Sequence, residues 1–240
     1  DYQVPVSDPQ VQAGPLGTAI YGQPDTYTYQ VPIDWPAVAG SCQDYTNTAT
    51  IDVTAGTDPT DSETVSVCAG ADLWVSKTAN TSYARDYDWT VTKSVDASRV
   101  EIAAGGTATS SYTVAVDKAG YTDSAWRVTG TITVHNPNPW AVQASVSDSI
   151  NIGGGASCLV AGKASESVNV PAHNSVDVAY ECTFTSQPAY EGVNTATATW
   201  EASVAHTANG RATGDAHVTF GDPAGETDRT VTASDPLAPA

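Results

Sequence analysis

The chain has 240 residues and a formal net charge of −18, and its 36 Ala, 32 Thr and 27 Val stand against four Leu and no Met. β-Branched side chains favour strands, and residues that build helices are scarce, so the composition argues against an α-rich enzyme and a doubly wound α/β fold. The acidic balance argues against nucleic acid as a partner, and no apolar run is long enough for membrane insertion.

Residues 1–71 are predicted to form an N-terminal β domain with about five strands, two of them short and interrupted by proline. Alternating segments occur at 26–33, 45–53 and 63–68, and turn-forming residues separate them. An immunoglobulin-type sandwich needs about seven strands. We therefore expect this domain to be incomplete and unable to close its own hydrophobic core.

Residues 72–222 contain ten or more alternating segments, enough for a complete, larger β-sandwich. Apolar residues occupy the odd positions of 87–95, except for Lys93, and most even positions of 126–134, which is typical of strands buried on one side. We expect four tryptophans to be core residues: Trp74, Trp89, Trp126 and Trp200. A sugar-stacking platform at Trp89 or Trp126 is the less favoured alternative, because it would need a surface aromatic.

After the sandwich comes a C-terminal tail, residues 223–240, which contains one further strand-like segment with no obvious partner in its own domain. A spare strand can complete an open sheet of another molecule through main-chain hydrogen bonds. The predicted donor strand consists of Thr227, Asp228, Arg229, Thr230, Val231, Thr232, Ala233 and Ser234. The opposite polarity, with residues 2–7 as the donor, stays open.

The four cysteines are spaced so that two local disulfides are predicted, Cys42–Cys68 and Cys158–Cys182. A zinc site is the weaker alternative, because no histidine lies near a cysteine at ligand spacing. Two disulfides indicate an oxidising compartment, so we expect the protein to be extracellular or at the cell surface.

Catalytic and cofactor motifs are scarce in the sequence. It has no nucleophile elbow, phosphate loop or dinucleotide fingerprint, so we predict no enzyme and no cofactor. Carboxylates cluster at Asp58, Asp61 and Glu63 and at Asp86 and Asp88, where Ca²⁺ is the alternative to a solvated acidic surface.

The sequence contains candidate sites for two kinds of covalent modification, a glycan and a lysine–asparagine cross-link. Asn80 begins a glycosylation sequon expected in a loop, and glycans on it are one prospective modification. A lysine–asparagine cross-link beside a buried acid would suit Lys93 better than Lys77. The favoured interpretation of Lys93, however, is an unmodified lysine whose charged end lies in solvent.

The segments 72–79, 87–96 and 130–139, with the Asn-Thr-Ala-Thr strings 47–50 and 194–197, resemble a known family. They are similar to the conserved-repeat immunoglobulin-like domains of bacterial and archaeal extracellular surface proteins. The resemblance implies a sandwich fold, a surface location and structural or adhesive work, with no catalytic residues.

These observations predict an all-β protein of two immunoglobulin-like sandwich domains, the first completed by a strand from a neighbouring subunit. The expected function is a structural subunit of an extracellular filament, a homopolymer that grows head-to-tail by strand complementation. One alternative is an adhesin or carbohydrate- or cell-binding segment of a long repeat protein. A piece of a covalent repeat array, whose tail opens the next domain, and an accessory domain of a secreted hydrolase are the other interpretations.

Overall fold

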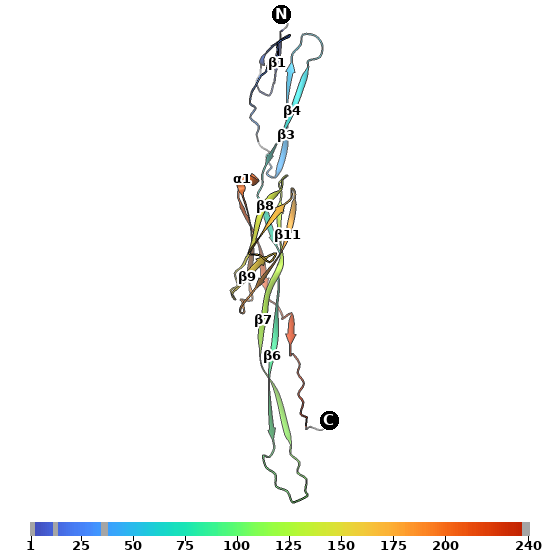
Figure 1. Ribbon diagram of the computed structural model, residues 1–240, viewed down its shortest axis with the longest axis vertical. Helices are drawn as coiled ribbons and strands as arrows, with labels where there is room; N and C mark the ends of the chain where they lie inside the picture. Colours follow the sequence, from blue (N-terminus) through green and yellow to red (C-terminus); the bar gives the residue numbers. More distant parts are fainter. Residues whose placement is uncertain (1–2, 12–13, 35–37, 237–240) are drawn as a thin grey trace.

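The computed structural model describes residues 3–11, 14–34 and 38–236 of the chain. The molecule is a narrow rod, with β1 (Gln3–Ser7) near one end and the loop between β6 (Asn80–Val95) and β7 (Tyr112–Asn136) at the other (Figure 1). Its regular structure is almost entirely β-strand, which confirms the all-β prediction. The one helix in the described residues, α1 (Ala202–Ala205), is too short to cross a membrane.

The middle of the rod is a β-sandwich. Besides β6 and β7, its strands are β5 (Trp74–Lys77), β8 (Val142–Ile150), β9 (Ser157–Val160), β10 (Ser165–Val170), β11 (Asn174–Thr183), β12 (Glu191–Trp200), β13 (Arg211–Thr219) and β14 (Gly225–Thr227). One sheet has the order β10-β8-β12-β13 and the other β14-β6-β7-β11-β9, with β5 paired to β7. Side chains from both sheets form one hydrophobic core, which begins at Leu73 and ends at Phe220.

The core follows the alternation of the sequence. Along β7, Val128, Ile132 and Val134 have no exposed surface, and Trp126 is 3% exposed. The Trp126 ring stacks on Tyr83 with the centroids 4.2 Å apart. Each fully buried large apolar side chain stabilises a fold by about 1.5–3 kcal/mol, so this row is a major source of stability for the sandwich.

A four-stranded sheet precedes the sandwich. It consists of β1, β2 (Pro15–Ile20), β3 (Ser41–Ile51) and β4 (Thr60–Ala69), in the order β2-β1-β3-β4. Within the described part of residues 1–71, Asp8 is the one buried residue, and no hydrophobic side chain is buried. This N-terminal sheet therefore has a single layer and no core of its own.

The junction between the N-terminal sheet and the sandwich is held by the Asn-Pro-Asn-Pro segment, residues 136–139. The fully buried side chain of Asn138 accepts a hydrogen bond from Ala71 N at 2.7 Å and donates one to Ala71 O at 2.8 Å. This pair of bonds satisfies the polar groups of both residues where the chain enters the sandwich.

The opposite end of the molecule is an arm, residues 86–122, in which β6 and β7 continue as a two-stranded ribbon beyond the sandwich (Figure 1). None of the residues of this arm is buried. A two-stranded hairpin without a second layer has little stability of its own. As in the N-terminal sheet, the apolar side chains of the arm are not covered by a second sheet.

Two of the predicted core tryptophans are not in the core. Trp126 and Trp200 are buried, whereas Trp74 is 52% exposed and Trp89 is 38% exposed. Trp74 points outward because it pairs with His135, while its neighbours Leu73 and Val75 point inward. Trp89 is on the apolar side of β6, but there the strand has entered the arm, where no second sheet lies over it.

The predicted donor strand is also shorter than expected in this structure. Only Gly225–Thr227 is a strand, β14, which pairs in parallel with residues 84–86 of β6. Residues 228–234 have no regular structure, since a strand cannot extend where no neighbouring edge is bonded to it. The tail therefore lies beside its own arm rather than free.

Candidate functional site: the two uncovered ends of the molecule

The N-terminal sheet has one polar and one apolar side. On the polar side, Thr46 meets Thr64 and Thr48 meets Ser62, with 2.8 Å between the hydroxyl oxygens of each pair. The opposite side carries Tyr45, Ala49, Ile51, Val65 and Val67, with the polar Gln43, Asn47, Asp61 and Glu63 between them. Such alternation is normal for a sheet with one buried side, and here the apolar side lacks a second sheet.

An extended segment, residues 24–34, lies across part of this apolar side. Its odd residues from Tyr27 to Ile33 are half-buried and its even residues are exposed, which is the alternation of a strand. Within the described residues, however, the segment makes no backbone–backbone hydrogen bond to any strand. Thr26 N–H is bonded to Asp25 Oδ1 and Asp34 C=O accepts from the Tyr45 hydroxyl. The backbone groups between them are therefore available to an added strand.

A groove of about 680 Å³ lies between this segment and the strands β3 and β4. Val31 and Ile33 line it from the segment, and Tyr45, Asn47 and Val65 line it from the sheet. The Asn47 carboxamide oxygen is buried without a hydrogen-bond partner. The groove is thus mostly apolar, with an unpaired acceptor in its wall.

Asp8 anchors one side of this groove. Its carboxylate accepts hydrogen bonds from the Tyr29 hydroxyl at 2.6 Å and from Gln10 N at 3.0 Å. Burial alone would raise the pKa of Asp8, but these bonds outweigh it and hold the pKa below its usual value of 3.8. The same hydrogen bond, together with burial, raises the pKa of Tyr29. Asp8 therefore fixes the segment 24–34 against the sheet in its ionised form.

The arm also has one apolar side. Pairing between β6 and β7 places Val91 opposite Val116, and Val95 opposite Tyr112. Val91 is 68% exposed and Tyr112 is 62% exposed. Polar residues alternate with them on the other side of the ribbon: Asp88, Thr90, Thr92, Ser94, Thr113 and Asp117. The arm therefore presents a strip of apolar side chains to solvent, interrupted by Lys93 and Lys118 on the same side.

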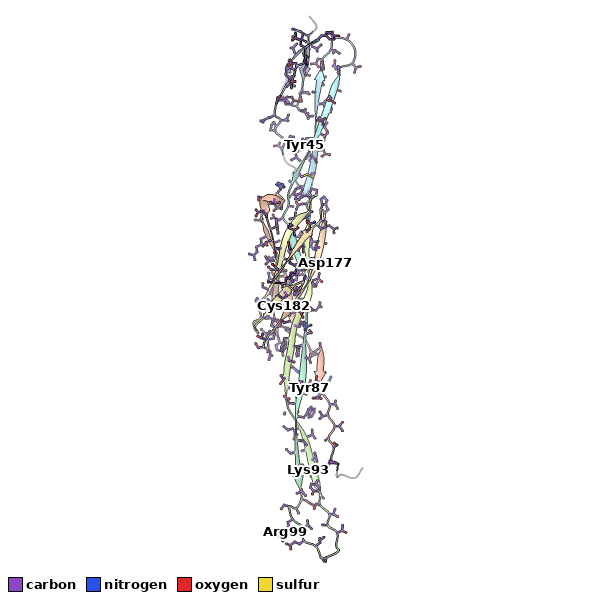
Figure 2. All side chains as sticks on the ribbon, in the orientation of Figure 1. Tyr45, Tyr87, Lys93, Arg99, Asp177 and Cys182 are labelled. Atoms are coloured by element: carbon purple, nitrogen blue, oxygen red, sulfur yellow. A yellow bond between two sulfur atoms is a disulfide. The ribbon has the colours of Figure 1, made fainter. Side chains whose placement is uncertain are left out.

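The tail follows this apolar strip through a few polar contacts. The Tyr87 hydroxyl donates to Glu226 Oε1 at 2.7 Å, which together with burial raises the pKa of Tyr87. Further along, Lys93 forms an ion pair with Asp235. Figure 2 shows Tyr87 and Lys93 spaced along the arm, and Tyr45 on the N-terminal sheet. Val231, between these contacts, stays 40% exposed.

The two ends also differ in charge. Residues 1–71 contain no Lys, Arg or His, although they contain acidic residues throughout. The arm holds three of the nine cationic side chains of the sequence: Lys93, Arg99 and Lys118. The arm also contains five acidic residues, so its net charge is −2, against −9 for residues 1–71.

Each disulfide joins residues directly opposite each other on neighbouring strands. Cys42–Cys68 links β3 to β4 in the N-terminal sheet, and Cys158–Cys182 links β9 to β11 in the sandwich. The N-terminal disulfide lies on the polar side of its sheet, opposite the groove, and therefore stiffens the sheet without filling the groove.

The remaining predicted site residues lie apart. Asn80 is exposed, but it is the first residue of β6 rather than part of a loop. Lys93 is partly exposed, and the polar partner of its amine is Asp235 rather than an asparagine. The clusters around Asp58 and Asp86 form no group of three metal ligands in the described part of the chain, where the one such group is Asp148 with the disulfide-bonded Cys158 and Cys182.

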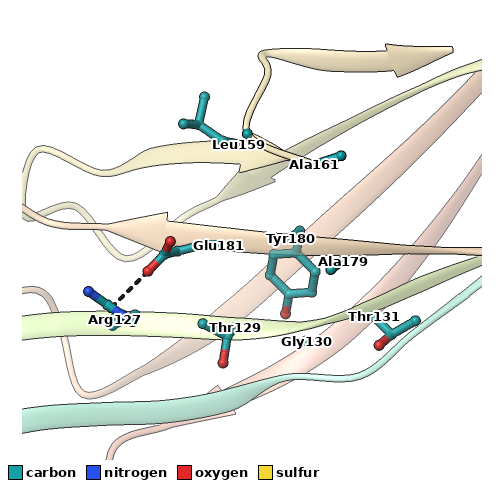
Figure 3. A pocket seen from close by; sticks show the side chains of 10 residues that line it. Arg127, Thr129, Gly130, Thr131, Leu159, Ala161, Ala179, Tyr180 and Glu181 are labelled. Carbon is teal, nitrogen blue, oxygen red and sulfur yellow. Dashed lines mark ion pairs between the residues drawn. The ribbon is translucent and has the colours of Figure 1, made fainter.

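Another hollow, of about 570 Å³, lies on the sandwich beside Tyr180 (Figure 3). Its walls are mainly small side chains such as Thr129, Thr131 and Ala179. One ion pair, between Arg127 Nε and Glu181 Oε1 at 2.8 Å, borders it. This hollow lacks a nucleophile–base pair, so the ends of the rod remain the stronger candidate site.

The apolar strip of the arm and the groove are features that sequence patterns indicated only in part. Alternation at 87–95 correctly marked the apolar side of β6, but it could not show that this side is uncovered. No family model matches the chain, and no curated protein or solved structure matches it either.

Proposed function

We propose that the protein is a structural subunit of an extracellular filament, in which each subunit completes the next one by β-strand complementation. In this proposal both parts are immunoglobulin-like, and the N-terminal one lacks strands that a neighbour supplies. The observation that carries the proposal is the absence of any buried hydrophobic side chain in the described part of residues 1–71, beside a sheet with an apolar side.

The acceptor is the groove between the segment 24–34 and the strands β3 and β4. A strand added there would bond to the unpaired backbone of the segment and place alternate side chains over Tyr45 and Val65. It would also shield the apolar side of the N-terminal sheet from water, at about 25 cal/mol for each Å² of apolar surface covered.

The donor is the tail of a second copy, with the apolar side of that copy's arm as the second layer. Between Asp228 and Pro236 the tail pairs with no strand of the described residues, and Thr230, Val231 and Thr232 have high strand propensity.

Donor and acceptor lie at opposite ends of the rod (Figure 1), so one contact leaves a free donor and a free acceptor. A heterologous contact of this kind repeats without closing when the rotation between subunits does not form a ring. A rod that joins end to end therefore produces a filament, and its two disulfides suit an oxidising extracellular environment.

The test uses one variant that blocks donation and one that blocks acceptance. Val231→Asp puts a charge on the tail side chain that would enter the groove, and Val65→Asp puts one in the groove itself. Thr230→Asp is the matched control, because its side chain would point away from the groove and the net charge changes equally. We expect filaments from the wild type and the control in negative-stain microscopy, and monomers from each blocked variant.

Mixing the two blocked variants sharpens this test. The Val65→Asp subunit still has a donor and the Val231→Asp subunit still has an acceptor, so an equal mixture should form dimers and stop there. Light scattering after size exclusion measures this directly. Filaments from Val231→Asp alone, at the wild-type yield, would contradict tail donation.

Binding of carbohydrates, as in an adhesin, is a second candidate function with one observation in its favour. The half-exposed Trp74 ring stacks on His135 with the centroids 3.4 Å apart, beside a hollow of about 510 Å³ bordered by His173 and Asn174. Exposed aromatic rings of this kind can stack on sugars. Glycan-array binding that is lost in Trp74→Ala would favour this function, and silence on the array would count against it.

A further inference from the structure

A charged side chain is enclosed in the core of the sandwich. Lys77 and Asp148 form an ion pair with 2.7 Å between Nζ and Oδ1, and neither side chain has any exposed surface. The other carboxylate oxygen, Oδ2, accepts a hydrogen bond from Asn194 Nδ2 at 2.9 Å. A single carboxylate therefore holds the lysine amine and the asparagine carboxamide side by side.

The three residues come from both sheets of the sandwich. Lys77 ends β5, which pairs with β7, whereas Asp148 on β8 and Asn194 on β12 belong to the opposite sheet. A bond between Lys77 and Asn194 would thus join the two layers directly.

The surroundings of the cluster are dry and aromatic. The Lys77 Nζ lies 3.0 Å from the centroid of the Tyr180 ring, and Tyr180, itself buried, donates its hydroxyl hydrogen to Thr78 O at 2.7 Å. Gly130 leaves room for this ring, since a Cβ there would lie 2.9 Å from Tyr180 Cε1. Figure 3 shows the Tyr180 ring reaching toward the strand at Gly130.

A purely structural ion pair at this place would not be expected to stabilise the sandwich more than apolar residues do. Desolvating two charges costs several kcal/mol, and apolar residues of similar volume often serve stability equally well. The Asn194 Oδ1 atom is also buried without any hydrogen-bond partner. A charged pair beside an unsatisfied carboxamide is more readily understood as a set of reactants than as an optimised contact.

The environment also favours the reactive form of the amine. Burial lowers the pKa of Lys77 to about 8, against the opposing effect of Asp148. A lysine with such a pKa is neutral in about a tenth of the molecules at pH 7, and only the neutral amine is a nucleophile.

We propose that Lys77 and Asn194 condense spontaneously into an intramolecular isopeptide bond, with Asp148 as the proton carrier. Asp148 takes a proton from the lysine ammonium, and the neutral Nζ attacks Asn194 Cγ. The Nζ–Cγ bond forms and the Cγ–Nδ2 bond breaks as protons pass through Asp148 to Nδ2, which leaves as ammonia. Asp148 ends as the neutral acid, so charges and atoms balance and no oxidant or reductant is consumed.

Condensation of Lys77 with Asp148 itself, with loss of water, is the competing chemistry. It would consume the one carboxylate that contacts Lys77 in the described residues, leaving no group to carry the protons. It would also leave the neighbouring carboxamide without a role. Asn194 is therefore the better acyl group, and the two products differ in mass.

Intact mass spectrometry of the purified full chain tests the proposal. Loss of one ammonia, about 17 Da below the mass calculated with two disulfides, is expected. A tryptic digest should contain a branched peptide that joins the Lys77 and Asn194 segments. An unmodified mass overturns the proposal, and a loss of about 18 Da with Asp148 in the branched peptide overturns the assignment to Asn194.

Variants identify the participants. Lys77→Ala, Asn194→Ala and Asp148→Asn should each restore the full mass, whereas Lys163→Ala, at an exposed ion pair, should keep the loss. If one of the variants in the core fails to fold, the intact mass of the wild type and its branched tryptic peptide still test whether the isopeptide bond forms. None of these readouts depends on filament formation, so the two proposals stand or fall separately.

Discussion

The indole N–H of Trp89 in the arm donates a 2.8 Å hydrogen bond to the backbone carbonyl of Asp228 in the tail. Together with the contacts of Tyr87 and Lys93, it holds the tail on its own molecule by side-chain bonds. Exposed contacts of this kind are worth little individually. The tail can therefore leave its own arm at small cost when a groove with unpaired backbone is offered.

Loosening the tail should promote assembly. Lys93→Ala removes the ion pair to Asp235, and the expected result is a shorter lag before light scattering rises. Such an exposed pair contributes at most about 1 kcal/mol, so the final yield of filaments should change little. Lys163→Ala, which removes another exposed pair, is the control. A longer lag for Lys93→Ala would mean that the ion pair promotes assembly instead of holding the tail on its own arm.

The N-terminal sheet should open in acid through Asp8. Its pKa is lowered in the folded protein, so Asp8 contributes stability that is fully present above its ordinary value of 3.8 and lost as the pH falls through the folded value. The NMR signals of the Tyr29 ring should therefore shift toward those of an exposed tyrosine below about pH 4. In Asp8→Asn this acid dependence should be absent, and an unchanged profile in that variant would contradict the assignment.

Breaking the N-terminal disulfide should affect one part of the molecule only. Without a core, the sheet relies on Cys42–Cys68, whose removal costs about 3 kcal/mol by loop entropy. The double variant Cys42→Ser with Cys68→Ser should lose amide protection in β3 and β4 while the sandwich stays protected. The reciprocal variant at Cys158 and Cys182 should weaken the sandwich. Equal loss of protection everywhere would show that the two parts unfold together.

The two tryptophans on apolar strand sides should behave differently. Trp126→Ala removes a buried ring stacked on Tyr83 and should lower the free energy of unfolding by about 3–5 kcal/mol. Trp89→Ala, in the uncovered arm, should lower it by only about 0.5 kcal/mol in the monomer. Thermal unfolding of monomeric protein measures both, and similar effects would mean that the arm is covered.

Much of the fold was predictable from local patterns. Period-two alternation located the strand around Trp126, because neighbouring side chains on a strand point to opposite sides. The strand predicted at 26–33 is not formed, since this segment alternates in burial but pairs with no other strand. The spacing of Cys42 from Cys68 and of Cys158 from Cys182 matched hairpins and nearby strands. The shortage of strands in residues 1–71 led to the prediction of an incomplete immunoglobulin-like domain, which stays a prediction.

Other features depended on distant neighbours. Alternation at Trp89 and Val91 shows which side of a strand is apolar, but a second layer must come from elsewhere, so burial cannot be read from the strand alone. The same limit applies to Trp74, whose side of β5 is set by pairing with His135. Lys77 looked like an ordinary strand residue, and only the packing of two sheets brings it to Asp148 and Asn194.

The sequence by itself determined the strand class, the disulfide pairs and the imbalance between a complete sandwich and a shorter N-terminal sheet, because these follow from side-chain period, spacing and count. Only the tertiary structure decided that the uncovered apolar sides lie at opposite ends of a rod, and that a lysine, an aspartate and an asparagine meet inside the core. Both outcomes depend on how separate strands stack in space, which no local pattern encodes.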